Sequence, residues 1–288
     1  LMLTIASPDE MRAWARERAA NGRTIGLVPT MGALHDGHLA LITDAARRCD
    51  DVVVSIFVNP LQFNEAADFD SYPRPIDHDV AACEAAGVSV VFAPSGTSMY
   101  PEHFQTRVVP GALAELMEGP MRPGHFEGVV TVVAKLFGAV RPDVSIFGQK
   151  DFQQLAIVTQ MASDLDMGIE VVGHPIVRDS DGVAQSSRNR LLTPAQRDAA
   201  ICVPRSLAAA RAAAATGAAP DDVVAAAAAI IDGERSAKRE YTTVFDARTL
   251  TELDRFDASD RLPGAVRIAT AVWFGDVRLI DNCDLFGD

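Results

Sequence analysis

The sequence contains only four cysteines, is short of basic residues and has no long apolar run. Cys49, Cys83, Cys202 and Cys283 form no C-x-x-C pair, which argues against a disulfide framework and against a cysteine zinc site. No stretch approaches the roughly 20 apolar residues that cross a bilayer, and no signal-peptide pattern opens the chain. We therefore expect a cytoplasmic protein with reduced thiols and no membrane partner.

Positive charge is scarce relative to negative charge. The chain has 26 lysines and arginines against 39 aspartates and glutamates, which gives a net charge of −13 at pH 7. Binding to a phosphate backbone requires a broad basic surface, so we expect no nucleic-acid partner. An anionic ligand would have to bind in a local pocket. With 288 residues, of which 48% are hydrophobic, the chain is long enough for one large or two ordinary domains with a real core.

Two common phosphate-binding motifs are absent. The chain has no G-x-x-x-x-G-K-[ST], and no G-x-G-x-x-G follows the apolar run at 24–28. The sequence His35-Asp36-Gly37-His38 comes next, and after it apolar residues recur at helical spacing. Both histidines are thus predicted in a strand-to-helix turn, where unpaired N–H groups and the helix dipole favour an anion. A zinc site, for which no further ligand cluster follows, and a pair of structural histidines are the alternatives.

Short apolar runs alternate with helical patterns through the first part of the chain. Continuous apolar runs are typical of parallel strands covered on both faces. The alternation predicts an α/β fold, a doubly wound parallel sheet over residues 1–177, with ligands beyond the carboxyl ends of its strands. The expected strands are 24–28, 51–58, 87–94, 143–148 and 169–177, and the expected helices are 38–48, 77–86, 127–140 and 151–165.

The pattern changes at about residue 178, which predicts a second, smaller α+β domain over 178–288. Thr193 followed by Pro194 is typical of a helix start. The alanine-rich stretch 207–229 is interrupted by "TGAAPDD", which predicts two helices. We expect the second helix to begin at Asp221 or Asp222, strands in 241–250 and 266–282, and a hairpin turn at Gly275-Asp276.

Four more polar clusters interrupt apolar segments, at 57–63 ("FVNPLQF"), 121–128 ("MRPGHFEG"), 148–154 ("GQKDFQQ") and 185–190 ("QSSRNR"). The amides of Asn59 and Gln62 could orient a small polar ligand or simply complete a turn. Lys150 directly follows an apolar strand, which favours a phosphate contact over a solvated loop. Arg188 can donate two hydrogen bonds to phosphate oxygens. The cluster at 121–128, in which Arg122 and His125 precede a predicted helix, is the weakest indication of a ligand site.

The motifs, and the order in which they follow one another along the chain, resemble those of the pantothenate synthetase (pantoate–β-alanine ligase) family of the nucleotidyltransferase superfamily. H-x-G-H alone indicates only the superfamily, which includes class I aminoacyl-tRNA synthetases. The sequences "FVNPLQF", "YPR" at 72–74, "GQKDFQQ" and "SSRN" narrow the resemblance to this ligase. It covers nearly the whole chain and implies a Rossmann-like sheet, with the smaller domain closing over the active site.

The resemblance implies a two-step ligation in pantothenate and coenzyme A biosynthesis. The carboxylate of pantoate attacks the α-phosphorus of ATP, which releases pyrophosphate and leaves pantoyl adenylate. The amine of β-alanine then displaces AMP and forms pantothenate. The resemblance also implies Mg²⁺ as a cofactor and a homodimer. His38, beside His35, is the implied proton donor, and Lys150 and Arg188 complete the implied catalytic set.

The same resemblance implies which residues bind ligands. Gln62 and Gln154 would hold pantoate, and Gln62 would also lie near the β-alanine site. Asn59, Arg122 and His125 would be neighbours of the substrate or of the phosphates, and Asp79 would be a ligand of Mg²⁺. ATP would contact Met31, Gly32, Ala33, Leu34, His35, Asp36, Gly37, His38, Gly148, Gln149, Lys150, Asp151, Val177, Gln185, Ser186, Ser187 and Arg188.

Three positions depart from the family pattern. Gln149 stands where a glutamate is usual, Gln185 where an apolar residue is usual, and His78 where an acidic residue is common. The last departure leaves Asp79, and after it Asp77, as the candidates for a ligand of Mg²⁺. The alternative functions are a nucleotidyltransferase that makes a dinucleotide or transfers AMP to another acid, and a nucleotide-binding regulator without catalysis. A tRNA synthetase is disfavoured by size and acidity.

Overall fold

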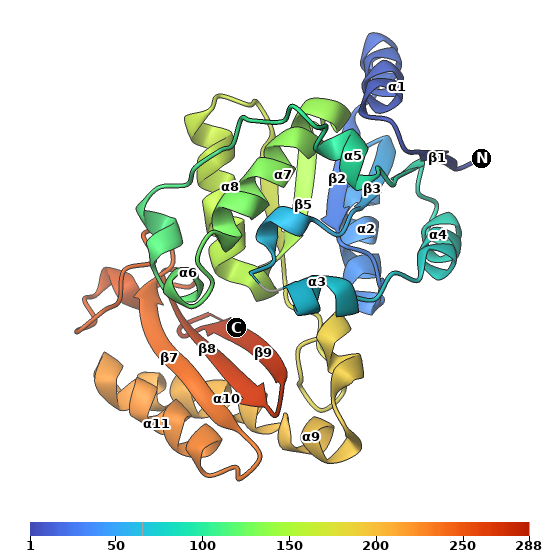
Figure 1. Ribbon diagram of the computed structural model, residues 1–288. Helices are drawn as coiled ribbons and strands as arrows, with labels where there is room; N and C mark the ends of the chain where they lie inside the picture. The colour runs from blue at the N-terminus through green and yellow to red at the C-terminus, as the bar shows by residue number, and fades with distance from the viewer. Residues whose placement is uncertain (65, 288) are drawn as a thin grey trace. The chain divides into compact units, whose positions relative to one another are not determined.

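The computed structural model describes residues 1–64 and 66–287. Judged by which residues lie close together in space, the chain divides into two compact units (Figure 1). The first unit comprises Leu1–Gln149 and Gln153–Pro175, and the second comprises Lys150–Phe152 and Ile176–Asp288. The segment Lys150–Phe152 therefore groups with the second unit, although in sequence it lies within the first.

A six-stranded sheet forms the centre of the first unit. All of its neighbouring strands are parallel, which confirms the predicted Rossmann-like sheet. The strand order is β1-β4-β3-β2-β5-β6, so the direction of winding reverses between β2 and β5. Ligands of such sheets bind beyond the carboxyl ends of the strands at this reversal. The strands are β1 (Leu3–Ile5), β2 (Ile25–Thr30), β3 (Asp51–Ile56), β4 (Val90–Phe92), β5 (Val144–Gly148) and β6 (Glu170–His174).

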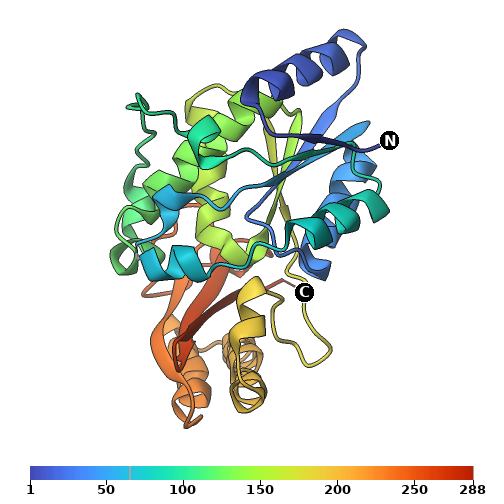
Figure 2. The same ribbon diagram turned by 45° about the vertical axis from the view of Figure 1, so that its right-hand side comes forward.

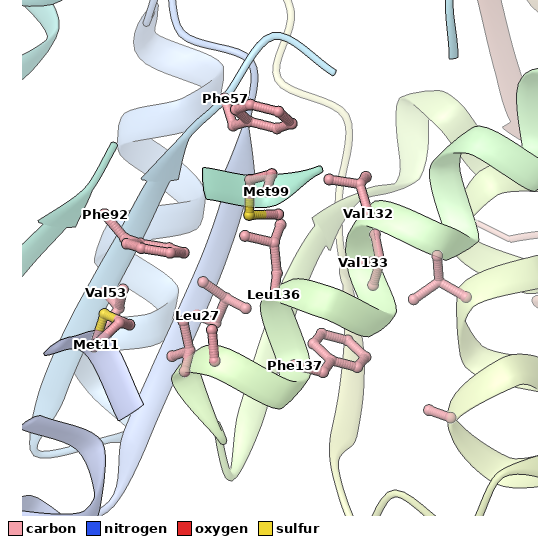
Figure 3. Packing of buried hydrophobic residues seen from close by; sticks show 14 of the residues in the cluster. Met11, Leu27, Val53, Phe57, Phe92, Met99, Val132, Val133, Leu136 and Phe137 are labelled. Atoms are coloured by element: carbon pink, nitrogen blue, oxygen red, sulfur yellow. The ribbon is translucent and has the colours of Figure 1, made fainter. Parts of the chain in front are cut away.

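Helices cover both faces of this sheet, which explains the continuous apolar runs (Figure 2). Successive strand residues point to opposite faces. Leu27 packs in one apolar cluster with Leu136 and Phe137, whereas Val28 packs in another with Leu41 and Ile42. Figure 3 shows the first cluster. It involves α1 (Pro8–Ala20), α7 (His125–Val140) and α8 (Phe152–Asp164), and the second involves α2 (Asp36–Arg48) and α4 (Ile76–Ala85).

The four helices expected in this part are confirmed to within two residues at each end, as α2, α4, α7 and α8. Helix α1 was not expected, although Ser7 caps it by accepting hydrogen bonds from the N–H groups of Asp9 and Glu10. Three shorter helices were also not expected: α3 (Ala66–Ser71), α5 (Gly96–Met99) and α6 (Glu118–Met121). They are too short to show a helical period.

The second unit contains an antiparallel sheet of order β7-β8-β9 and is the predicted α+β part (Figure 2). The expected hairpin turn at Gly275-Asp276 is confirmed, and Gly275 has a positive φ of 61°. Thr193 caps α9 as predicted. The elements are α9 (Pro194–Ala199), α10 (Cys202–Ala215), α11 (Pro220–Asp232), β7 (Lys238–Asp246), β8 (Val266–Phe274) and β9 (Val277–Asp284).

One expected helix start in the second unit was wrong. Helix α11 begins at Pro220, with Ala219 as its N-cap, and not at Asp221 or Asp222. Proline is favoured at the first helical position because its missing N–H would have no partner there. The two aspartates lie in the first turn instead, where they interact favourably with the helix dipole. Within the described residues, no helix is long and apolar enough to span a membrane.

Candidate active site

The predicted histidine turn connects β2 to α2 in the first unit. His35 is the N-cap of α2, and its Nδ1 accepts a hydrogen bond from the N–H of Gly37 at 3.1 Å. Nδ1 of His38 accepts one from the N–H of His35 at 3.3 Å. A neutral imidazole that accepts through Nδ1 carries its proton on Nε2. Both rings are therefore N–H donors through Nε2 at the positive end of a helix.

Asp79 of α4 holds the turn that precedes these histidines. Its Oδ2 accepts a hydrogen bond from the N–H of Ala33 at 2.7 Å, and its Oδ1 accepts one from Leu34 at 2.8 Å. The turn needs positive φ at Gly32 (84°) and at Ala33 (52°). A Cβ on Gly32 would lie 2.9 Å from Oδ2 of Asp79, so only glycine allows this close approach.

These contacts do not fit the metal role expected for Asp79. The carboxylate is only 1% exposed, and each oxygen already accepts a backbone N–H. His78 is exposed and its Nδ1 lies 3.5 Å from Oδ1 of Asp79. Among the described residues, no group of three or more His, Cys, Asp or Glu side chains could hold a metal ion. Asp79 thus fixes the backbone of the turn.

A second polar group in the first unit surrounds the 3₁₀ turn Pro60–Gln62. The hydroxyl of Tyr100 donates to Oδ1 of Asn59 at 2.7 Å, and burial raises the pKa of Tyr100, which keeps the proton on this donor. Nδ2 of Asn59 donates to Oε1 of Gln62 at 3.1 Å. Because Oε1 of Gln62 accepts this bond, the NH₂ group of Gln62 points away from Asn59. Its Nε2 lies 3.2 Å from Sδ of Met31.

The backbone of this turn packs closely on α7. A Cβ on Gly128 would lie 2.3 Å from the carbonyl oxygen of Leu61, so glycine is required there. Nδ1 of His125 lies 2.8 Å from the carbonyl oxygen of Gln62 and must donate to it. Nε2 of His125 then accepts from Nη1 of Arg122, at 3.3 Å. His125 therefore holds the backbone of Gln62, and Arg122 holds the His125 ring.

The carboxyl end of β5 carries Gly148 and Gln149. Nε2 of Gln149 donates to the carbonyl oxygen of Gly173 at 3.3 Å, a bond that an ionised glutamate could not make. The departure from glutamate therefore has a local structural role. Farther along, in α8, Gln153 is buried and bonds to the backbone of Glu118, Leu113 and Leu116. Gln154 beside it is half-buried.

In the second unit, Lys150 and Asp151 belong to the 3₁₀ turn Gln149–Asp151. Nζ of Lys150 lies 3.7 Å from Oδ2 of Asp151, and the Lys150 side chain is 19% exposed. The carbonyl oxygen of Lys150 accepts a hydrogen bond from Nδ2 of Asn282 at 2.9 Å. The lysine is thus anchored through its backbone to β9.

The other predicted nucleotide contacts of the second unit lie on two adjacent segments. The N–H of Gln185 donates to the carbonyl oxygen of Val177 at 2.9 Å. The Gln185 side chain donates to Oδ1 of Asp179 at 3.1 Å, so this departure from an apolar residue has a polar partner. Oγ of Ser186 accepts from the N–H of Arg188 at 3.3 Å and starts the 3₁₀ turn Ser187–Leu191. Ser187 is buried.

The structure brings together the histidine turn and the group around Gln62, which meet where Nε2 of Gln62 lies 3.2 Å from Sδ of Met31. It also pairs the Val177 and Gln185 segments. Tyr100 and Asn282 were not among the expected residues, because no local pattern marks them. They lie 41 and 132 positions from their partners Asn59 and Lys150.

Comparison with known proteins identifies one family over almost the whole chain. The family model described as pantoate-beta-alanine ligase matches residues 3–284. A pantothenate synthetase from Heliobacterium modesticaldum is 49% identical over 282 residues, which cover 98% of this chain and 98% of the relative. The crystal structure of pantothenate synthetase from Thermus thermophilus has a TM-score of 0.91 at 42% identity, and the match covers 99% of this chain and 100% of that one.

A solved structure with bound ligands is also similar. It is a pantoate-beta-alanine ligase from Francisella tularensis, complexed with beta-gamma ATP and beta-alanine, with a TM-score of 0.80 and 30% identity. The match covers 100% of this chain and 99% of that one. The resemblance inferred from the motifs is confirmed, and the chain belongs to the pantoate–β-alanine ligase family.

Proposed function

We propose that this chain ligates pantoate to β-alanine with ATP, through a pantoyl adenylate, and releases pyrophosphate and AMP. Membership of the ligase family over residues 3–284 is the observation that carries the proposal. The structure also contains hydrogen-bond donors of the kind that can stabilise charge on phosphoryl oxygens. Two imidazole N–H groups lie at the N-terminus of α2, which follows a strand at the reversal point of the sheet.

The first step needs stabilisation of charge more than proton transfer. The pantoate carboxylate is already ionised at pH 7, so no general base is needed for its attack on the α-phosphorus. The barrier comes from the approach of two anions and from charge that grows on the phosphoryl oxygens. His35 and His38 would donate to these oxygens through Nε2. Lys150 and Arg188 would supply positive charge, and Arg188 can donate two bonds at once.

Gln62 is the proposed anchor for pantoate. Because Asn59 donates to its Oε1, Gln62 presents its NH₂ group, which suits an oxygen acceptor of the substrate. Gln154 is proposed as a second contact with pantoate. In the second step the β-alanine amine must be uncharged when it attacks the acyl carbon, and the site must keep water away from the reactive anhydride.

We propose that ATP contacts Met31–His38, Gly148–Asp151, Val177 and Gln185–Arg188. We also propose that Mg²⁺ accompanies the nucleotide. The described side chains offer no dedicated site for this ion, and Asp79 is occupied by two backbone amides. Mg²⁺ commonly binds through substrate phosphates and water rather than through an all-protein cage. We therefore assign it no protein ligand.

Replacing Tyr100 by phenylalanine tests the orientation of Gln62. The variant keeps the aromatic contacts with Phe57 and Phe104 but removes the O–H that fixes the Asn59 amide. We expect kcat/KM for pantoate to fall about fivefold to tenfold, which corresponds to roughly 1 to 1.4 kcal/mol for one lost buried hydrogen bond. ATP affinity should stay unchanged. An unchanged kcat/KM for pantoate, or an equal loss of ATP affinity, would contradict the proposal that Tyr100 orients Gln62 through Asn59.

The proposed reaction is tested by product analysis. The purified chain is incubated with ATP, pantoate and β-alanine, and nucleotides are separated by chromatography. We expect equal amounts of AMP, pyrophosphate and pantothenate, and pyrophosphate release that depends on pantoate and not on other hydroxy acids. ADP as the product would contradict the adenylate mechanism. Equal activity with another hydroxy acid would favour a nucleotidyltransferase of different specificity.

A further inference from the structure

The segment Lys150–Phe152 is held by side chains of the second unit. Nδ2 of Asn282 in β9 donates to the carbonyl oxygen of Lys150 at 2.9 Å. The guanidinium carbon of Arg267 in β8 lies 4.4 Å from the centre of the Phe152 ring. The rings of Phe152 and Phe245 lie with centres 6.0 Å apart. These contacts come from all three strands of the sheet, so the turn that carries Lys150 rests on a rigid support.

The orientation of the Asn282 amide follows from its other partner. Oδ1 of Asn282 accepts two hydrogen bonds from Arg267, from Nε at 3.0 Å and from Nη2 at 2.7 Å. Because a guanidinium group can only donate, the oxygen of the amide must face Arg267. The NH₂ end therefore faces the Lys150 carbonyl. Asn282 is 2% exposed and Arg267 is 7% exposed, so water does not compete for these bonds.

The strand that carries Asn282 is itself fixed. Arg178 makes two hydrogen bonds to the carboxylate of Asp281, at 2.6 and 3.0 Å, and also donates to the carbonyl oxygen of Asn282 at 3.3 Å. The N–H of Asn282 donates to Oδ1 of Asp281 at 2.7 Å. Burial raises the pKa of Asp281, and Arg178 acts in the opposite direction. Asn282 can therefore transmit a fixed position to the Lys150 backbone.

We propose that Asn282 is a positioning residue for Lys150, which it holds by linking the Lys150 carbonyl to Arg267. This inference rests on the proposed function, in which the Lys150 ammonium meets the charge that grows on ATP. A lysine side chain is long and flexible, so the direction of its ammonium depends on a fixed backbone. Loss of the anchor should reduce preorganisation for the transition state more than it reduces binding of ATP.

Replacing Asn282 by aspartate separates positioning from packing. Aspartate has nearly the same shape and keeps an oxygen toward Arg267, but it places a second oxygen against the Lys150 carbonyl, where the donor was. We expect the single-turnover rate of pantoate-dependent pyrophosphate release to fall about 10- to 30-fold, as for a misplaced catalytic group. The dissociation constant of ATP, measured by calorimetry, should change by less than about threefold. Asn282→Ala is the second variant and should slow the same step.

Asn21→Asp is the matched control. Nδ2 of Asn21 also donates to a carbonyl oxygen, that of Glu17, at 2.9 Å, but it does so on the exposed end of α1. The control loses the same kind of bond and should keep the wild-type rate. A rate in Asn282→Asp and in Asn282→Ala that equals that of the control would overturn the proposal.

A double-mutant cycle distinguishes action through Lys150 from a general effect on the fold. In a Lys150→Ala background, Asn282→Asp should change the remaining rate by no more than about twofold, because the group that it positions is gone. A further fall of the same size as in the wild-type background would overturn the proposal. If the unmodified chain released no pyrophosphate with pantoate, the proposed function itself would have failed, which is a different outcome from either result.

Discussion

Replacing Lys150 by alanine is expected to lower the single-turnover rate of pantoate-dependent pyrophosphate release by about 10²- to 10³-fold, or roughly 3 to 4 kcal/mol. The side chain is largely buried and its backbone is anchored by Asn282. The charge that it meets grows as the α-phosphorus is attacked, so the attraction is stronger in the transition state than in bound ATP. The dissociation constant of ATP should therefore change much less than the rate.

Two further variants make this prediction specific. Lys150→Arg should restore only part of the rate, because a planar guanidinium group places its charge differently from an ammonium. Lys238→Ala removes an exposed lysine of β7 in the same unit and should leave the rate unchanged. Weaker ATP binding with an unchanged single-turnover rate would show that Lys150 anchors the ground state only.

Replacing His38 by alanine is expected to slow adenylate formation by about 10²-fold or more, as the loss of an acid–base or charge-stabilising group does. The fold should persist. The variant loses one capping bond to the N–H of His35, and such bonds contribute about 0.5 to 2 kcal/mol to the free energy of unfolding. Rates from rapid quench and unfolding midpoints from thermal melts, measured on the same preparation, would separate the two effects.

His38→Glu distinguishes the cap from the chemistry. A glutamate at this position can accept the bond from the N–H of His35, as in an ordinary capping box, but it has no N–H to offer a phosphate. We expect a normal unfolding midpoint and a rate as low as that of His38→Ala. His103→Ala, at an exposed histidine, is the control for both. Loss of the fold in His38→Ala with normal residual turnover would instead support a structural role.

The long, periodic elements could be predicted because each is specified by its own residues. Strands β2 to β5 are buried along almost their whole length, α2, α4 and α8 repeat buried positions at helical spacing, and α7 is a long apolar segment. Strand β1 could not be predicted, because it has three residues and only Ile5 is buried. The start of α11 was misplaced by one or two residues because an acidic first turn looks like a cap when Pro220 is ignored.

The candidate catalytic side chains could be chosen from sequence more readily than the groups that hold them. His35 and His38 are adjacent to a strand end, so a local pattern marks them. Their support, Asp79, lies on another helix, and its sequence neighbours do not reveal whether its carboxylate faces a metal ion or two backbone amides. The expected metal role came from the family resemblance, which gives the residue type at this position but not the contacts of its carboxylate. The partners that fix Asn59 and Lys150 are visible only once the chain has folded.

Transfer of ¹⁸O from pantoate tests the central claim most directly. Pantoate labelled in both carboxylate oxygens is incubated with the chain, ATP and β-alanine, and the products are examined by mass spectrometry. An adenylate intermediate keeps one labelled oxygen as the acyl–phosphorus bridge, and attack by the amine leaves that oxygen on phosphorus. We therefore predict AMP with one ¹⁸O and pantothenate with the other in its new amide. Unlabelled AMP, or label in inorganic phosphate beside ADP, would contradict the adenylate route.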